Sequence, residues 1–316
     1  PSRGLGDVYK RQVYHNFDFT KVGEVLLHGT NWWWMFFSLL FGVLAQVFRG
    51  WRWKQMLEPL EAFPKRSDCV NAIFISYAAS LIVPRVGEVS RCGVLAKYDN
   101  VSFAKSLGTV VTERLVDTLT ILLITGVTVL LQLPIFVTFL QQTGTKIPSL
   151  LHLLTSVWFY IVLFCFIGVG MLLYYLRKTL FFYERVKGFV LNIWEGVMSL
   201  KGVRNIPLFS FYTLAIWGCY FFHFYFTFYC FAFTAHLSIL AALVMFVGGT
   251  FAVIVPTPNG AGPWHFAVIS MMMLYGVNET DAGIFALIVH GIQTFLVVLL
   301  GVYGLAALSL TNRQRK

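Results

Sequence analysis

The stretch that decides the fold runs from Leu81 to Asp117 and reads LIVPRVGEVSRCGVLAKYDNVSFAKSLGTVVTERLVD. It begins with a break at proline and glycine and continues into an otherwise apolar helix. Both parts carry charged side chains: Arg85, Glu88, Arg91, Glu113, Arg114 and Asp117. A charge at the centre of a membrane-spanning helix costs about 2.5–3.5 kcal/mol, so these charges require partners. They form the first candidate site.

The rest of the chain is too apolar for a soluble protein. Of its 316 residues, 58% are hydrophobic and 12% are charged, and the mean hydropathy is +0.72. Soluble domains carry about 25% charged residues, so the composition indicates an all-α, multi-pass membrane protein without a separate soluble domain. The net charge of +10 lies mostly in loops beside apolar segments. That placement is typical of membrane topology and of contact with anionic lipid headgroups, and it does not favour nucleic-acid binding.

The chain divides into three parts of unequal length. Residues 1–12 (PSRGLGDVYKRQ) read as a translated cloning or sequencing scar, and residues 13–30 read as an amphipathic segment at the membrane surface. Residues 31–316 form one transmembrane domain. Its predicted spans are residues 31–48, 106–131, 151–176, 206–233 and 283–310.

Lysine and arginine set the predicted orientation. They gather in residues 49–66, 84–105 and 177–205 and at the C-terminus, which the positive-inside rule places in the cytoplasm. The apolar segment 69–83 is short and lies between two positive loops. We therefore expect a re-entrant hairpin there, broken at proline and glycine. Segments 237–255 and 264–275 predict a second one from the opposite face.

These hairpins predict an inverted repeat. Residues 31–131 form one unit and residues 206–310 the other, joined by the connecting helix 151–176 and the cytoplasmic loop 177–205. The two breaks share letters, VPRVGEVSR and VPTPNGAGPWH. Breaks at matching places in two halves indicate a transporter's binding site. The alternative is coincidence, because glycine and proline are common in membrane helices.

Each candidate residue has a functional and a structural interpretation. Glu113, Arg114 and Asp117 share a helix face, and they either line a polar cavity or only pin the helix to its neighbours. Arg85 and Arg91 bracket Glu88, and they either bind a phosphate or anchor a cytoplasmic loop.

The second break contributes candidates without a full charge. They are Pro256, Pro258, Gly260, Gly262 and His265. His265 either titrates in a cavity or serves as an ordinary hydrogen-bonding group between helices. No histidine lies at a metal-ligand spacing from Cys, Asp or Glu, and no nucleotide-binding or nucleophile motif is present. The sequence therefore predicts neither catalysis nor a cofactor.

The motifs G-E-x-x-R at 87–91 and E-R-x-x-D at 113–117, followed by PTPNGAGPWHF at 256–266, resemble the lysylphosphatidylglycerol synthase transmembrane-region family. The resemblance runs from about residue 18 to the C-terminus. It implies a flippase-like domain that moves modified lipids between leaflets, fused in some relatives to a soluble aminoacyltransferase domain. By position it rests on Gly87, Glu88, Arg91, Glu113, Arg114, Asp117, Pro256, Pro258, Gly260 and Gly262. This chain departs from the family pattern at Asn259, where glycine is frequent, and at His265, where an acidic residue is frequent.

Together these observations predict a lipid transporter, not an enzyme, in a bacterial cytoplasmic membrane. Its substrate would be an anionic or modified phospholipid, or a polyprenyl-linked lipid, with the headgroup phosphate on Arg85 and Arg91. Two alternatives stay open. One is a non-transporting membrane partner of a separate glycosyl- or aminoacyltransferase, and the other is a secondary transporter of small solutes.

Overall fold

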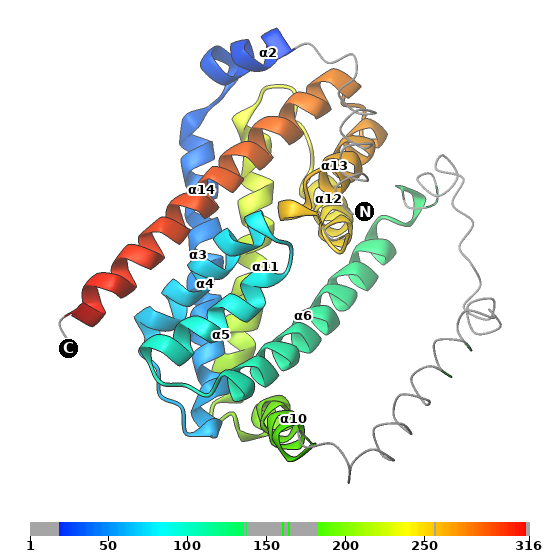
Figure 1. Ribbon diagram of the computed structural model, residues 1–316. Helices are drawn as coiled ribbons and strands as arrows, with labels where there is room; N and C mark the ends of the chain where they lie inside the picture. The colour runs from blue at the N-terminus through cyan, green and yellow to red at the C-terminus, as the bar shows by residue number, and fades with distance from the viewer. Residues whose placement is uncertain are drawn as a thin grey trace.

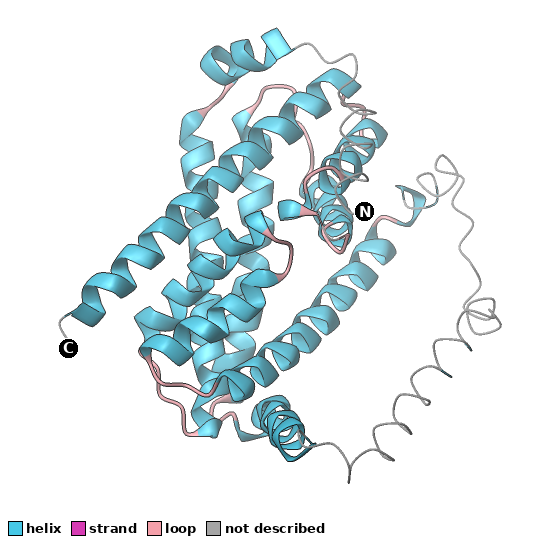
Figure 2. Ribbon diagram, in the orientation of Figure 1, coloured by secondary structure: helices cyan, strands magenta, loops and turns pink. Residues whose placement is uncertain are grey.

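The computed structural model describes residues 19–135, 137, 160, 164, 183–255 and 257–313, and these residues fold into helices joined by short turns (Figures 1 and 2). The helices are α2 (Phe19–Glu24), the π-helical turn η1 (Val25–Gly29), α3 (Trp32–Leu57), η2 (Glu58–Leu60), α4 (Arg66–Ile82), α5 (Val86–Tyr98), α6 (Phe103–Leu131), α10 (Tyr183–Met198), η3 (Ser199–Gly202), α11 (Ile206–Tyr225), η4 (Phe226–Cys230), α12 (Ile239–Ala252), η5 (Pro258–Gly260), α13 (Pro263–Leu274) and α14 (Glu279–Arg313). No strand occurs among the described residues.

Among the described residues, four stretches are long and apolar enough to cross a membrane: Trp32–Leu60, Phe103–Leu131, Ile206–Cys230 and Glu279–Thr311. The sequence predicted a span at each of these places. An all-α, multi-pass membrane protein is therefore confirmed. The connecting helix predicted at 151–176 lies outside the described residues.

The first span differs from its prediction at its end. It was expected to stop at residue 48, with residues 49–66 in a cytoplasmic loop, but α3 continues to Leu57. Arg49 and Arg52 are 3% and 0% exposed, so both arginines lie inside the bundle. They do not end the helix because carboxylates from α6 neutralise them there. Two of the arginines assigned to the loop are therefore internal.

Both predicted breaks separate a pair of short helices that pack against each other, α4 with α5 and α12 with α13. Val83 is extended, as expected for a residue before proline, and it ends α4. Arg85 then turns the chain in the left-handed region, with φ of 66°. The second break is longer, and Asn259, Gly260 and Gly262 all have positive φ, with values of 53°, 73° and 98°.

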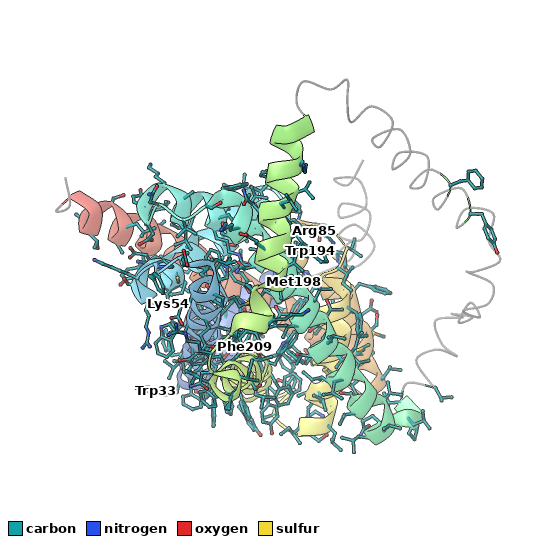
Figure 3. The ribbon with its side chains drawn as sticks, turned by 90° about the horizontal axis from the view of Figure 1, so that it is seen from below. Trp33, Lys54, Arg85, Trp194, Met198 and Phe209 are labelled. Carbon is teal, nitrogen blue, oxygen red and sulfur yellow. The ribbon has the colours of Figure 1, made fainter. Side chains whose placement is uncertain are left out.

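The packing of these pairs brings distant parts of the chain together. Helix α4 lies against both α3 and α14, α11 lies against α3, and α13 packs on α14. In Figure 1, α6 crosses the bundle obliquely, and the N-terminal end of α6 meets α10. Figure 3 views the molecule from that end, with Trp194 and Met198 labelled on α10.

The orientation of α6 decides what its charges can do. Leucines at 115, 119, 122 and 123 are exposed, Leu119 to 69%, as suits a face toward lipid. Glu113 and Asp117 point the other way and are buried. The charged face of α6 is therefore turned into the protein.

Candidate functional site

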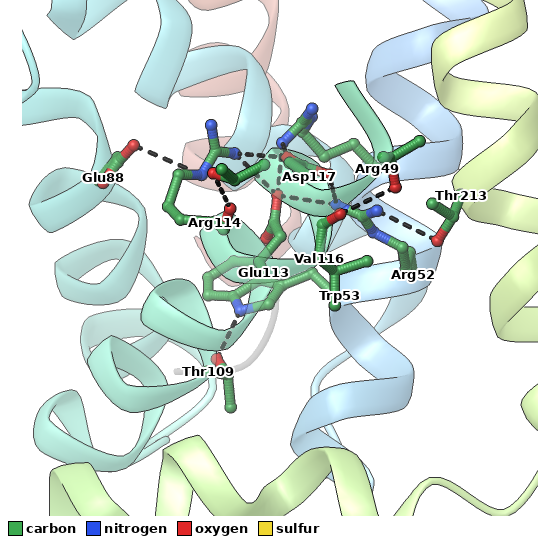
Figure 4. Close-up of polar contacts among 12 residues, drawn as sticks. Arg49, Arg52, Trp53, Glu88, Thr109, Glu113, Arg114, Val116, Asp117 and Thr213 are labelled. Carbon is green, nitrogen blue, oxygen red and sulfur yellow. Dashed lines mark hydrogen bonds and ion pairs between the residues drawn. The ribbon is translucent and has the colours of Figure 1, made fainter. Parts of the chain in front are cut away.

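Glu113 and Asp117 lie one turn apart on α6 and face arginines of α3 (Figure 4). The Arg49 guanidinium donates through Nη1 to Glu113 Oε1 and, at 2.8 Å, to Asp117 Oδ2. Arg52 donates to Asp117 Oδ1 at 2.7 Å and to Thr213 Oγ1 of α11 at 3.2 Å. These ion pairs join α3, α6 and α11 within the apolar part of the bundle.

The network extends to the first hairpin through Arg91 on α5. Its Nη1 donates to Glu113 Oε2 at 2.8 Å, and its guanidinium lies 4.7 Å from the centroid of the Trp53 ring. The Trp53 indole in turn donates to Thr109 Oγ1 at 2.8 Å. Arg91 is only 2% exposed, and its Nε and Nη2 have no hydrogen-bond partner among the described residues. It is therefore a structural member of the network with unused donors.

Arg114 and Glu88 form the accessible edge of the network. The Arg114 side chain is 42% exposed, and its Nε lies 3.6 Å from Glu88 Oε1. Its Nη2 lies 3.1 Å from Glu113 Oε1 and 3.2 Å from Asp117 Oδ2. Arg85, also exposed, donates from Nη2 to the Ile254 carbonyl oxygen at 3.1 Å and so joins the two hairpin breaks.

A polar pocket of about 570 Å³ lies between the two breaks. Its walls come from α4, α5 and α6 on one side and from the second break on the other. Four arginines and one carboxylate line it, along with hydroxyl and amide side chains: Arg49, Arg85, Arg91, Arg114, Glu88, Ser76, Ser80, Thr257 and Asn259. The pocket is therefore strongly positive.

An apolar pocket of about 470 Å³ adjoins it, between α6, α11 and α12. Aromatic and aliphatic side chains form most of its wall, among them Ile121, Leu122, Trp217, Phe224, Phe246 and Trp264. The two pockets share lining residues, which are Arg49, Tyr77, Arg114, Thr118, Val253 and Ile254. One continuous site thus has a charged end and a hydrocarbon-like end.

The second break carries no Asp, Glu, Lys or Arg, and hydrogen bonds between polar groups shape it. Asn259 Nδ2 donates to Thr294 Oγ1 at 2.7 Å, and the backbone carbonyl oxygen of Asn259 lies 3.0 Å from His290 Nε2. The His265 ring accepts from the Gly262 backbone N–H at 3.3 Å and caps the start of α13. His265 is buried beside the His290 ring and lines neither pocket.

The predicted site residues therefore fall into groups. Arg85, Glu88, Arg91, Arg114 and Gly260 line the polar pocket, and Asp117 lines the apolar one. Glu113 is sealed within the network, and Gly87, Pro258, Gly262 and His265 shape the helix ends that surround the site. Pro256 lies outside the described residues.

The residues of the site that the sequence did not reveal include Arg49, Arg52, Tyr77 and Tyr220. Arg49 and Arg52 are three residues apart, a spacing that puts both on one helix face. Their position just after an apolar run instead suggested a loop. Nothing in the sequence pairs Tyr77 with Tyr220, which are 143 residues apart.

Comparison with known proteins agrees with the resemblance carried by the two motifs. A family model described as the lysylphosphatidylglycerol synthase TM region matches residues 11–301. No curated protein and no solved structure matches the chain. Because the family model covers most of its length, the chain belongs to the lysylphosphatidylglycerol synthase transmembrane-region family.

Proposed function

We propose that this protein is a transporter that moves an amphiphilic lipid between the leaflets of a bacterial cytoplasmic membrane. The observation that carries the proposal is the joined pair of pockets, one rich in arginine and the other lined by apolar rings. A lipid has the same division, with a polar headgroup and hydrocarbon chains. A small solute would have no use for the apolar half.

The charges of the site favour an anionic headgroup. Among the described residues, five arginines (Arg49, Arg52, Arg85, Arg91 and Arg114) face three carboxylates (Glu88, Glu113 and Asp117), an excess of two positive charges. A bound anion would offset this excess and could accept charge-assisted hydrogen bonds from the guanidinium groups. Arg85 and Arg114 are the accessible cations, and we assign the phosphate to them. Arg91 supports them from within the network.

The hairpins supply the parts that could move. In this proposal both are re-entrant and belong to an inverted repeat whose breaks meet at the substrate site, as in transporters built from broken helices. The hydrogen bond from the Arg85 guanidinium to the Ile254 carbonyl oxygen then joins the breaks in the state described here. The C-terminus would lie in the cytoplasm. The protein would move lipids that other enzymes make, since we propose no catalytic step for it.

Translocation in proteoliposomes tests the proposal. Purified protein is reconstituted with a chain-labelled anionic phospholipid, and loss of label from the outer leaflet is followed after addition of an impermeant quencher. Wild-type protein should speed the exchange of lipid between leaflets. Arg114→Gln should slow it at least about tenfold, because a hydrogen bond to a charged group contributes about 1.5–3 kcal/mol.

The matched control is Arg204→Gln, which removes an exposed arginine that lines neither pocket. It should leave the rate unchanged. Wild-type protein that moves no lipid of any headgroup class would overturn the proposal. Equal rates for Arg114→Gln and Arg204→Gln would overturn the assignment of the headgroup site.

A further inference from the structure

Two tyrosines meet where the polar pocket joins the apolar one. Tyr77 comes from α4 and Tyr220 from α11, and their hydroxyl oxygens are 2.6 Å apart. Tyr77 lines both pockets, and Tyr220 lines the apolar pocket. The hydroxyl pair therefore stands at the boundary between the part of the site that suits a phosphate and the part that suits hydrocarbon.

This pair has one proton more than its own hydrogen bond uses. Each phenol has a single O–H, so when one hydroxyl donates to the other, the second proton stays available to another acceptor. The guanidinium of Arg49, 5.7 Å from the Tyr220 ring centroid, has donors only and cannot accept that proton. Both tyrosines are half-buried and Tyr77 lines the polar pocket, so a molecule in the site can reach this donor. A bound molecule with an acceptor oxygen beside the two tyrosine hydroxyls would form a hydrogen bond with the second proton.

Diacyl phospholipids and polyprenyl phosphates, the two lipid classes that the sequence leaves open, differ in the chemical group that follows the phosphate. In a diacyl phospholipid, ester carbonyl oxygens lie between the phosphate and the chains. In a polyprenyl phosphate, hydrocarbon begins directly after the phosphate ester oxygen. Only the first class places a strong acceptor beside the tyrosines when its phosphate lies near Arg85 and Arg114.

We infer that the Tyr77–Tyr220 pair recognises the ester carbonyl of a diacylglycerol phospholipid and so selects this class over polyprenyl phosphates. The inference rests on the proposed lipid transport and names the substrate class of that same site. Tyr77 and Tyr220 act as specificity-determining residues that donate one hydrogen bond to the lipid. They take part in no covalent step.

Ester and ether lipids with the same headgroup and chains isolate this hydrogen bond. Translocation of a chain-labelled diacyl phospholipid is compared with that of its dialkyl counterpart, which lacks both carbonyl oxygens. Wild-type protein should favour the ester lipid about fivefold, the ratio that corresponds to one ordinary hydrogen bond. Unlabelled polyprenyl phosphate should compete no better than the dialkyl lipid.

Removal of both hydroxyls should abolish the preference, because either hydroxyl alone keeps a proton that it can donate to the lipid. The double variant Tyr77→Phe/Tyr220→Phe should bring the ester-to-ether ratio close to one. The control Tyr303→Phe removes a hydroxyl from an exposed tyrosine on α14 and should keep the wild-type ratio. Because the readout is a ratio within one variant, a lower amount of folded protein does not affect it. If the double variant fails to fold, the wild-type comparison of ester with ether lipid still tests the inference.

The outcomes separate this inference from the proposed function. Transport without preference for the ester lipid, or a wild-type preference for polyprenyl phosphate, would overturn the inference and leave lipid transport standing. An ester preference that persists in the double variant Tyr77→Phe/Tyr220→Phe would also overturn it. Failure of wild-type protein to move any lipid would overturn both.

Discussion

The two hairpins are interrupted at similar sequences, but different interactions hold the two breaks in shape. The α4–α5 break is short, and the helix after it brings Glu88 and Arg91 to an ionic network. The α12–α13 break spans ten residues, from 253 to 262, and contains no charged side chain. Its shape comes from positive-φ residues and from hydrogen bonds of Asn259 to α14.

Because of this difference, the two hairpins contribute different groups to the site. The first hairpin carries the charges that would hold a headgroup, and it depends on α3 and α6 to neutralise them. The second offers backbone carbonyl groups, such as that of Ile254. Substitutions should therefore disturb folding most in the first hairpin and its network, and least at the groups that only join the two breaks.

The largest effect should follow from Glu113→Gln. The neutral side chain would leave Arg49 and Arg91 without the carboxylate that now pairs with both. Loss of one partner from a buried ion pair costs about 3–5 kcal/mol. Thermal unfolding in detergent should show a clear loss of stability. Near-wild-type stability would mean that water reaches the network and that it is not a sealed support.

The next largest effect should come from Gly87→Ala, the closest approach within the first hairpin. A Cβ at this position would lie 1.9 Å from the Ser76 carbonyl oxygen, so α4 and α5 would have to separate. Overpacking of this kind costs about 1–3 kcal/mol. The same measurement should find Gly93→Ala, on the same helix with nothing within 4 Å, neutral or slightly stabilising. Similar results for the two variants would contradict the tight crossing.

A moderate effect is expected in the second hairpin from Asn259→Ala. It removes the hydrogen bond to Thr294 and puts alanine at a φ of 53°. The combined cost should be about 1–3 kcal/mol. Asn259→Gly loses the same hydrogen bond but tolerates the backbone, so its unfolding temperature should lie between those of Asn259→Ala and the wild type. A glycine variant less stable than the alanine variant would contradict the strain expected at this positive φ.

The smallest effect on stability should come from Arg85→Ala. Arg85 is exposed, and its guanidinium donates a hydrogen bond to the carbonyl oxygen of Ile254. Unfolding should shift by less than about 1 kcal/mol, while lipid translocation should fall several-fold because an accessible cation is lost. A large loss of stability would show that this contact holds the hairpins together. An unchanged translocation rate would remove Arg85 from the headgroup site.

The sequence predicted much of this arrangement because its strongest signals are local. Apolar length located the four spans, and proline with glycine located both breaks. The cluster Glu113, Arg114 and Asp117 was visible because charges within an apolar helix require partners. The family resemblance carried by the two charged motifs is confirmed by the family match.

What the sequence did not show depends on contacts between distant segments. Arg49 and Arg52 looked like the start of a positive loop, and only the approach of α6 reveals their carboxylate partners. Phosphate binding by Arg91 beside Arg85 stays a prediction; its ion pair with Glu113 and the greater exposure of Arg114 were not visible in the sequence. The meeting of Tyr77 with Tyr220 depends on the packing of α4 near α11, which no local pattern records.

The central claim is that one lipid occupies both pockets at once, and site-resolved photocrosslinking tests it most directly. Two anionic phospholipids are compared in membranes, one with a photoreactive group at the headgroup and one with it at the end of an acyl chain. The headgroup probe should label the segment 84–88 or 257–260, and the chain probe should label Trp217 or Phe246. Labelling by both probes that is confined to the outer leucines of α6, such as Leu119 and Leu123, would contradict the account.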